Sequence, residues 1–252
     1  MPIFETDSIV LRSYNLSEAD RIVVLYTHDH GLIRAVAKGA RRLRSKFGSS
    51  LEPFCEARIE YFQKDDRELV SLQNADLIQS SFAAASQPEL LTTFSHFADL
   101  LVAFAPPHDP NKVLYRMIRA CILVRPNGPG EHEAIKLYFE TWIMRLGGYL
   151  PDWSNCGICK RRFSQAETAQ LLSGYRLACG TCMHGHSAES VSAPERETLQ
   201  AILQTAPEEF VQSADLTSIR NVRSVVARIV TASSGRDVAP LSQSVANSQR
   251  TK

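Results

Sequence analysis

The chain has no apolar run of about 18 residues, the length that a membrane-spanning helix requires. Its first residues, MPIFETDSIVLRS, include acids where a secretory signal peptide has a basic start and an apolar core. Net charge is also nearly absent, because 28 basic residues face 27 acidic residues, for a formal +1. These absences predict a cytoplasmic protein that has no membrane partner.

The sequence also lacks the usual signatures of catalysis. It contains no G-x-x-x-x-G-K-[ST] phosphate loop, no H-E-x-x-H, no G-x-S-x-G and no zinc-deaminase pattern. The pair His132-Glu133 has no second histidine beside it, and the seven histidines are scattered. We therefore predict no catalytic residues and no enzyme, although an unrecognised hydrolase acting on DNA is an alternative.

Four of the six cysteines form two C-x-x-C pairs, Cys156-Gly-Ile-Cys159 and Cys179-Gly-Thr-Cys182. In a reducing compartment such pairs are more typical of metal binding than of disulfides. Each pair lets two thiolates meet one ion, and two pairs complete a tetrahedral zinc site without an open position. The sequence therefore predicts a structural zinc held by Cys156, Cys159, Cys179 and Cys182.

Other thiols and imidazoles near this pattern have different interpretations. A redox role for either pair requires a thioredoxin-like βαβ context, which the pattern lacks. His184 and His186 could replace a thiolate, but four cysteines already suffice. Cys55 and Cys121 lie in apolar strand and helix patterns, which predicts that both are core residues.

Five short β-branched or aromatic runs occupy the first eighty residues: SIVLRSYN, RIVVLYTHD, LIRAVAKGA, EARIEYFQK and ELVSLQNADL. Turn signals separate them, such as those at 28–31 and 64–67. Five strands in this length predict a small closed barrel. Both an SH3-like barrel and an OB-fold fit the count, and the strand pattern does not choose between them.

After residue 82 the apolar spacing changes to the helical period. Pro106-Pro107 ends the first helix, Asp109 with Pro110 is predicted to open the second, and a capping box opens the fourth. The five predicted helices span 88–105, 109–124, 131–146, 192–204 and 217–232.

The predicted fold class is therefore α+β, with a barrel followed by an α-helical domain that carries an inserted Cys₄ zinc knuckle. The predicted barrel covers residues 1–80, and the helical domain covers 81–235 with its zinc-binding insertion at about 153–190. Residues 236–252 have almost no apolar periodicity, which predicts a disordered tail.

The positive charge is concentrated in the segment KGARRLRSKF, residues 38–47, which has five basic side chains and no acid. The barrel region as a whole is polarised rather than basic, with similar numbers of both signs. Such a run is most often a solvated face, but segregated charge in a neutral chain is also expected where one face meets a polyanion. The candidate DNA-contacting residues are Arg34, Lys38, Arg41, Arg42, Arg44 and Lys46.

Three later basic groups also lack acids within their runs, and each could equally be a solvated helix face. One of them, within 112–125, is a candidate surface for a second DNA strand. The groups are Lys112, Arg116, Arg119 and Arg125; Lys160, Arg161 and Arg162; and Arg220, Arg223, Arg228 and Arg236.

Aromatic residues near the basic segment could stack on nucleic-acid bases. The candidates are Phe47, directly after the run, and Tyr61 and Phe62 on a predicted strand. Tyr61 and Phe62 point to opposite faces of that strand, so at most one can stack. The alternative for each is the barrel core, which we favour for Phe62.

These features together resemble the RecO family of bacterial recombination mediators and DNA-repair proteins. The resemblance rests on the barrel that carries KGARRLRSKFGSSLEPF at residues 38–54, on the helical domain, and on the four-cysteine knuckle within it. It covers nearly the whole chain in element order. The chain departs from the family after Gly235, where its tail is longer and more polar than expected.

The resemblance implies that the barrel is an OB-fold and that the basic segment contacts DNA backbones. It also implies binding of single- and double-stranded DNA, annealing of complementary strands, and work with RecR to load RecA onto DNA coated by single-stranded-DNA-binding protein. The same resemblance implies that the protein associates with the nucleoid during repair. It also implies that the four cysteines bind zinc. The alternative is a zinc-stapled scaffold that binds proteins and touches nucleic acid weakly.

Overall fold

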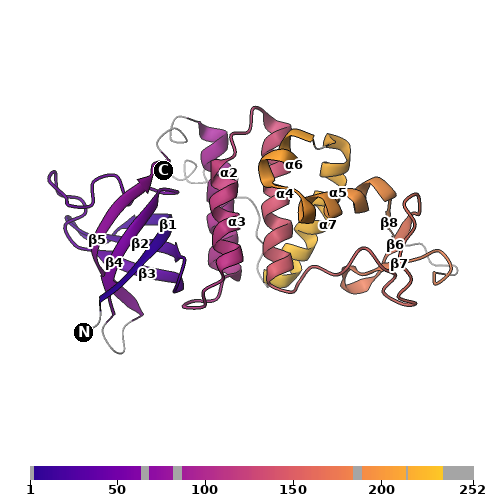
Figure 1. The fold of residues 1–252 in the computed structure, drawn as a ribbon, viewed down its shortest axis with the longest axis horizontal. Helices are drawn as coiled ribbons and strands as arrows, with labels where there is room; N and C mark the ends of the chain where they lie inside the picture. Colours follow the sequence, from indigo (N-terminus) through magenta and orange to yellow (C-terminus); the bar gives the residue numbers. More distant parts are fainter. Residues whose placement is uncertain (1–2, 64–67, 82–86, 184–188, 214, 235–252) are drawn as a thin grey trace, which may run out of the picture.

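The computed structural model describes residues 3–63, 68–81, 87–183, 189–213 and 215–234. Along these residues a β-barrel is followed by three helices, by a small lobe that contains the C-x-x-C pairs, and by three further helices. The barrel and the lobe lie at opposite ends of an elongated molecule, with the helices between them (Figure 1). Among the helices that are described, none is long and apolar enough to cross a bilayer.

The barrel is an OB-fold, because its strands close in the order β1-β2-β3-β5-β4 and β4 pairs back with β1. All of these pairings are antiparallel except the one between β3 and β5, which is parallel. This finding decides between the two barrel types that the strand pattern left open. The strands are β1 (Ile3–Asn15), β2 (Arg21–Thr27), β3 (Gly31–Ala37), β4 (Glu56–Phe62) and β5 (Leu69–Gln79).

Strand alternation gives the barrel two apolar faces. Inside it, alternate residues such as Val23 and Leu25 of β2 pack with Ala35 of β3 in one buried cluster. On the outside, Val24 and Tyr26 of β2 belong to a second cluster that includes the helices. The helical layer therefore covers one outer side of the barrel.

The main helices confirm the periodic pattern of the sequence, and the capping box that opens α5 is present. One predicted boundary was wrong: the N-cap of α3 is Asn111 rather than Asp109. The Oδ1 atom of Asn111 accepts hydrogen bonds from the backbone N–H groups of Val113 and Leu114, each at 3.0 Å. The helices are α2 (Pro88–Phe104), α3 (Lys112–Leu123), α4 (Pro129–Leu146), α5 (Ala193–Gln204), α6 (Pro207–Ser213) and α7 (Leu216–Ser234).

The sequence pattern missed the shortest elements. Helix α6 has seven residues, and strands β6 (Ala169–Leu171), β7 (Leu177–Ala178) and β8 (Ser190–Val191) have two or three each. Elements of this length contain too few residues to display a period. The predicted turn at 64–67, the histidines at 184 and 186, and the predicted tail at 236–252 lie outside the described residues.

A run of aromatic rings joins the barrel to the helices. Phe54, just before β4, packs on Phe94 of α2 with 4.8 Å between ring centroids. Phe94 contacts Phe97, and Phe97 stacks on Phe139 of α4 at 4.0 Å. Because these rings are buried in one cluster, the barrel and the helical layer share a continuous core.

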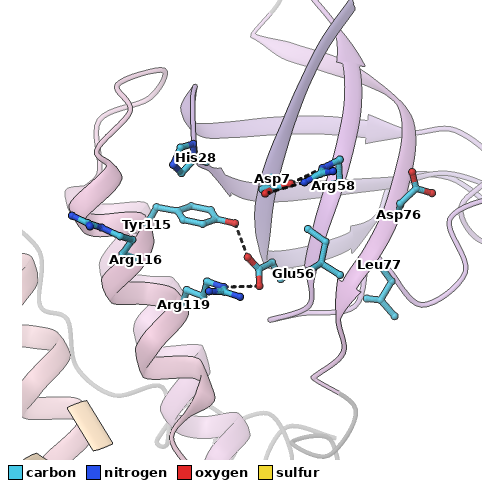
Figure 2. A pocket seen from close by; sticks show the side chains of 10 residues that line it. Asp7, His28, Glu56, Arg58, Asp76, Leu77, Tyr115, Arg116 and Arg119 are labelled. Atoms are coloured by element: carbon cyan, nitrogen blue, oxygen red, sulfur yellow. Dashed lines mark hydrogen bonds and ion pairs between the residues drawn. The ribbon is translucent and has the colours of Figure 1, made fainter. Parts of the chain in front are cut away.

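A polar contact lies beside this core, where β4 meets α3 (Figure 2). The buried Glu56 carboxylate accepts hydrogen bonds from the Tyr115 hydroxyl at 3.1 Å and from Arg119 Nε at 2.9 Å. Burial and the nearby Glu56 raise the pKa of Tyr115, and the bond to Glu56 raises the pKa of Arg119. Asp7 and Arg58 form an ion pair across the same pocket, which has a volume of about 530 Å³.

We expect Tyr115→Phe to lower the free energy of unfolding by about 1–2 kcal/mol, because a buried carboxylate then loses one of its hydrogen bonds. Urea denaturation measures this change. Tyr149→Phe is the control, since the exposed Tyr149 at the end of α4 should change stability little. Equal stability of both variants would show that the barrel and α3 do not depend on this bond.

Candidate nucleic-acid interface and metal centre

The basic segment forms a loop between β3 and β4, and we call residues 38–46 the basic loop. The loop is fastened at its start to the β1–β2 connection: the backbone N–H of Gly39 donates to Asp20 Oδ1 at 2.8 Å, and that of Arg41 donates to the Ala19 carbonyl at 3.0 Å. After the loop, Phe47 and Leu51 are buried in the barrel core. These anchors leave the side chains between them facing outward.

All of the candidate DNA-contacting side chains are exposed. Arg34, on the outer face of β3, forms an ion pair with the exposed Glu68 at 3.4 Å. Arg41 donates to the carbonyl of Ser17 at 2.6 Å, which is a contact to a neutral group. Within the described part of the chain, no acid pairs with the five cations of the basic loop, which are Lys38, Arg41, Arg42, Arg44 and Lys46.

The three later basic groups differ from the basic loop because the fold supplies acids to them. Lys112 lies 3.7 Å from Asp29, and Arg119 is bound to Glu56. Arg161 pairs with Glu167 at 2.6 Å. Arg223 pairs with Glu133 and Glu140, Arg228 pairs with Glu189, and residue 236 lies outside the described chain. Although these three groups contain no acid within their own sequence segments, the fold places acids from other segments beside them.

Two of the three aromatic residues proposed for base stacking are buried and cannot stack on a base. Phe47 and Tyr61 are only 2% and 3% exposed, and both belong to the barrel core. Our preference for Phe62 as the core residue was wrong, because Phe62 is only partly buried and lies opposite to Tyr61 on β4. The prediction that Cys55 and Cys121 are core residues is confirmed, since both are buried.

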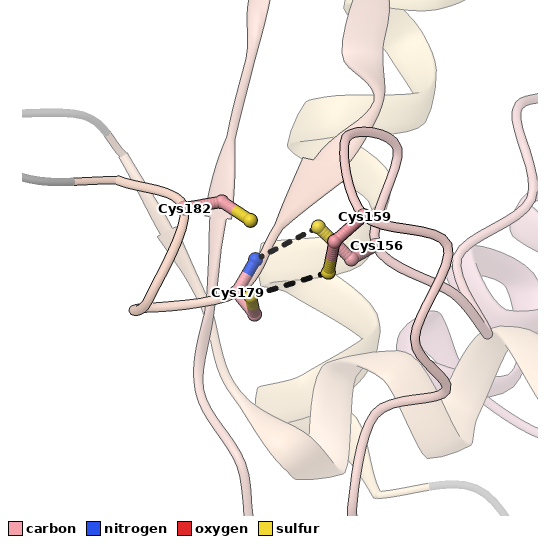
Figure 3. Close-up of side chains that lie close together, drawn as sticks. All are labelled: Cys156, Cys159, Cys179 and Cys182. Atoms are coloured by element: carbon pink, nitrogen blue, oxygen red, sulfur yellow. Dashed lines mark hydrogen bonds between the residues drawn. The ribbon is translucent and has the colours of Figure 1, made fainter.

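The four cysteines of the two C-x-x-C pairs converge on one point (Figure 3). Their sulfur atoms all lie within 4.8 Å of one another, and none forms a disulfide. The sulfurs of Cys159 and Cys179 are 3.8 Å apart. This equals the edge of a tetrahedron with metal–sulfur bonds of about 2.3 Å, which is about 3.8 Å. The arrangement can therefore hold one metal ion.

Hydrogen bonds shift the pKa values of two of these thiols in opposite directions. Burial opposes ionisation of Cys156, but backbone N–H groups, among them that of Cys179 at 3.4 Å, donate to its sulfur and lower its pKa. Hydrogen bonds to Cys179 and Cys159 raise the pKa of Cys182. A bound cation would stabilise all four as thiolates and remove this competition for protons.

The cysteine lobe is attached to the helices by polar contacts and packing. The Tyr175 hydroxyl donates to the carbonyl of Arg228 in α7 at 3.1 Å, and Arg196 of α5 donates to the carbonyls of Ser164 and Glu167. The Arg196 guanidinium also lies 4.9 Å from the ring of Phe163. These contacts hold the lobe against the helices, at the opposite end of the molecule from the barrel that carries the basic loop (Figure 1).

The fold and its two sites define a class: an OB-fold protein with a basic loop, a helical domain and a four-cysteine centre. Family comparison gives the same result. The chain matches the family models of the recombination protein O N-terminal domain over residues 1–81 and of its C-terminal domain over residues 85–239. The chain therefore belongs to the recombination protein O family.

Curated relatives carry the name DNA repair protein RecO. The protein of Koribacter versatilis is 34% identical over 62% of this chain and 63% of its own length. Those of Bifidobacterium animalis and Thermodesulfovibrio yellowstonii are 31% and 28% identical, covering 77% and 76% of this chain and 79% and 74% of their own lengths. Family membership assigns the chain a role in DNA repair and recombination.

Proposed function

We propose that this protein is a DNA-binding recombination mediator whose barrel, residues 1–80, contacts single- and double-stranded DNA. It anneals complementary strands and, with RecR, helps to load RecA onto DNA coated by single-stranded-DNA-binding protein, at the nucleoid in the cytoplasm. The observation that carries the DNA-binding part is the exposed basic loop, whose cations pair with no acid among the described residues. The named partners rest on the family alone.

Uncompensated cations on a nearly neutral protein favour a polyanionic ligand. Each lysine or arginine that neutralises a phosphate releases a condensed counterion, and this release drives binding at low salt. The later basic groups are weaker candidates, because five of their cations, at least one in each group, already pair with acids. The proposed backbone contacts are Arg34, Lys38, Arg41, Arg42, Arg44 and Lys46.

Replacing Arg42 and Arg44 by Ala should weaken binding to all DNA sequences by a similar factor. The log–log salt slope on a single strand should also fall in magnitude, by about 0.7 for each phosphate that the variant no longer neutralises. Oligonucleotide titrations at several salt concentrations measure both quantities. We choose this pair because Arg41 also holds the β1–β2 connection through Ser17.

Arg145→Ala with Arg176→Ala is the matched control, since both residues are exposed and lie outside the basic groups. It removes the same charge from the chain, so it separates a local contact from a change in net charge. If both double variants bind with the wild-type slope, the basic loop is a solvated face and not a DNA contact.

We further propose that the four-cysteine centre holds zinc and that the zinc is structural. Four cysteines fill a tetrahedral site, so no position remains for water or substrate. The centre also lies at the opposite end of the molecule from the basic loop (Figure 1). Its role is then to hold the two knuckles and the small β6–β7–β8 sheet together, and no catalytic step is assigned to this protein.

Cys159→Ala should release about one zinc per chain and loosen residues 153–183 while the barrel stays folded, because all four ligands are local to the lobe. Metal analysis and hydrogen exchange follow the two effects. Cys121→Ala is the control, because this buried thiol lies in α3 and outside the metal cluster. Absence of zinc from protein purified under reducing conditions without chelator would refute the assignment.

Annealing by this protein requires no nucleotide hydrolysis, because the chain has no phosphate-binding loop. Complementary strands repel each other through their phosphates, and cationic side chains reduce that repulsion and raise the local strand concentration. The basic loop supplies one such surface. The group at 112–125 is a weaker candidate for the second strand than its sequence indicated, because Lys112 and Arg119 pair with acids.

Wild-type protein should accelerate annealing of complementary oligonucleotides at low salt without ATP, and Arg42→Glu with Arg44→Glu should abolish that acceleration. Fluorescence annealing assays measure the rate, and circular dichroism checks that the variant is folded. Arg145→Glu with Arg176→Glu should keep most of the activity. An uncatalysed rate with wild type, or full activity in the folded loop variant, would rule out this mechanism.

A further inference from the structure

A row of apolar side chains crosses the outer face of the barrel beside the basic loop. Tyr14 of β1 is paired with Ile22 of β2, and Ile22 is paired with Val36 of β3. Their neighbours along the chain, such as Val23 after Ile22 and Ala35 before Val36, point into the barrel core. Tyr14, Ile22 and Val36 therefore project outward together, and we call them the outer row.

The helical layer stops short of the outer row. In the adjacent row, Val24 is buried under the helices, and Arg12 forms an ion pair with Asp99 of α2. In contrast, Tyr14 is 48% exposed, and Ile22 and Val36 are only partly buried. Tyr14, Ile22 and Val36 belong to neither of the two buried clusters of the described residues.

The outer row is continuous with the basic loop. The β1–β2 connection, 16–20, begins two residues after Tyr14 and holds the start of the loop by hydrogen bonds. Its Leu16 is 49% exposed, and Leu43 in the centre of the basic loop is fully exposed. Apolar and cationic side chains are thus interleaved at this edge.

Two of the acids near this edge already have partners. Asp20 accepts a hydrogen bond from the backbone N–H of Gly39, and Glu68 pairs with Arg34. Both acids therefore lie at the margins of the basic loop, and neither neutralises the cations at its centre. Glu18 of the β1–β2 connection is also exposed, but the five cations of the basic loop outnumber these three acids, so the edge presents net positive charge next to apolar surface.

A ligand that matches this surface must present flat apolar groups beside a regular series of negative charges. Single-stranded DNA has this chemistry, because its bases are unpaired and its phosphates repeat. A duplex offers the phosphates but keeps its bases stacked inside. The outer face of the second and third strands is also where OB-folds commonly bind oligonucleotides.

We propose that the outer row binds the bases of single-stranded DNA, with Tyr14 stacking on one base while the basic loop contacts the phosphates on either side. This inference rests on the proposed function and adds to it a site that reads the single-stranded state. The phosphate contacts bind either form of DNA, and the stacking contact adds affinity for the single strand alone.

The test compares oligo-dT with an abasic strand of equal length, which has the same phosphates and no bases. Tyr14→Ala should weaken binding of oligo-dT by about tenfold, within the range measured for loss of one stacked base. It should leave the abasic strand, duplex DNA and the salt slope unchanged. Tyr14→Phe should bind as wild type, because the ring is retained, and Tyr149→Ala is the control for loss of an exposed tyrosine elsewhere.

A second measurement uses the wild-type chain. An oligonucleotide carrying 5-iododeoxyuridine should cross-link to Tyr14 on irradiation, and peptide mass spectrometry locates the linked residue. Cross-links found only outside the outer row, or equal binding of oligo-dT by wild type and Tyr14→Ala, would overturn the stacking site. If the Arg42 and Arg44 double variant is still weakened in that case, the proposed function stands. If wild type binds no DNA, both proposals fail.

Discussion

The contact between Phe54 and Phe94 decides how the basic loop is presented. Phe54 has a left-handed backbone, with φ of 64°, which turns the chain from the loop segment into β4. Its ring enters the helical core, while Phe47 and Leu51 enter the barrel core. The segment after the basic loop is therefore fixed in both cores. Because its ends are held, the loop can display cations without a helix or strand of its own.

The distribution of acids matters more to this protein than the number of cations. A chain with a net charge of +1 could neutralise every basic group by pairing. Instead, acids distant in sequence reach the later groups, as Glu56 reaches Arg119 across 63 residues. The barrel leaves the basic loop without such partners among the described residues. Segregated charge of this kind favours an anionic ligand on one face and limits nonspecific attraction elsewhere.

Sequence periodicity predicted the long elements well, because a strand or helix buried on one side must repeat its apolar residues. The C-x-x-C spacing predicted the metal centre for a similar local reason. Neither kind of pattern reveals the pairing of β3 with β5, which distinguishes the OB-fold, or the register that aligns Tyr14 with Ile22. The bulge between Val10 and Arg12 also breaks the simple alternation before Tyr14. Phe47 and Tyr61 were chosen as stacking candidates because they lie near the basic run in the sequence. The structure places both in the barrel core.

The small number of exposed stacking groups in the described barrel fits the proposed annealing role. A base stacked on Tyr14 cannot also stack between its neighbours inside a duplex, so this proposed contact must be released as the duplex forms. Stacking on an aromatic side chain is worth about 1–3 kcal/mol per base, and each duplex step is worth about 1.4 kcal/mol on average. Two or three new base pairs therefore offset one such contact, whereas a long row of aromatic rings would hold the strand against its complement. In the proposed arrangement, a barrel with one exposed tyrosine beside the basic loop can bind a single strand and still release it to a complementary one.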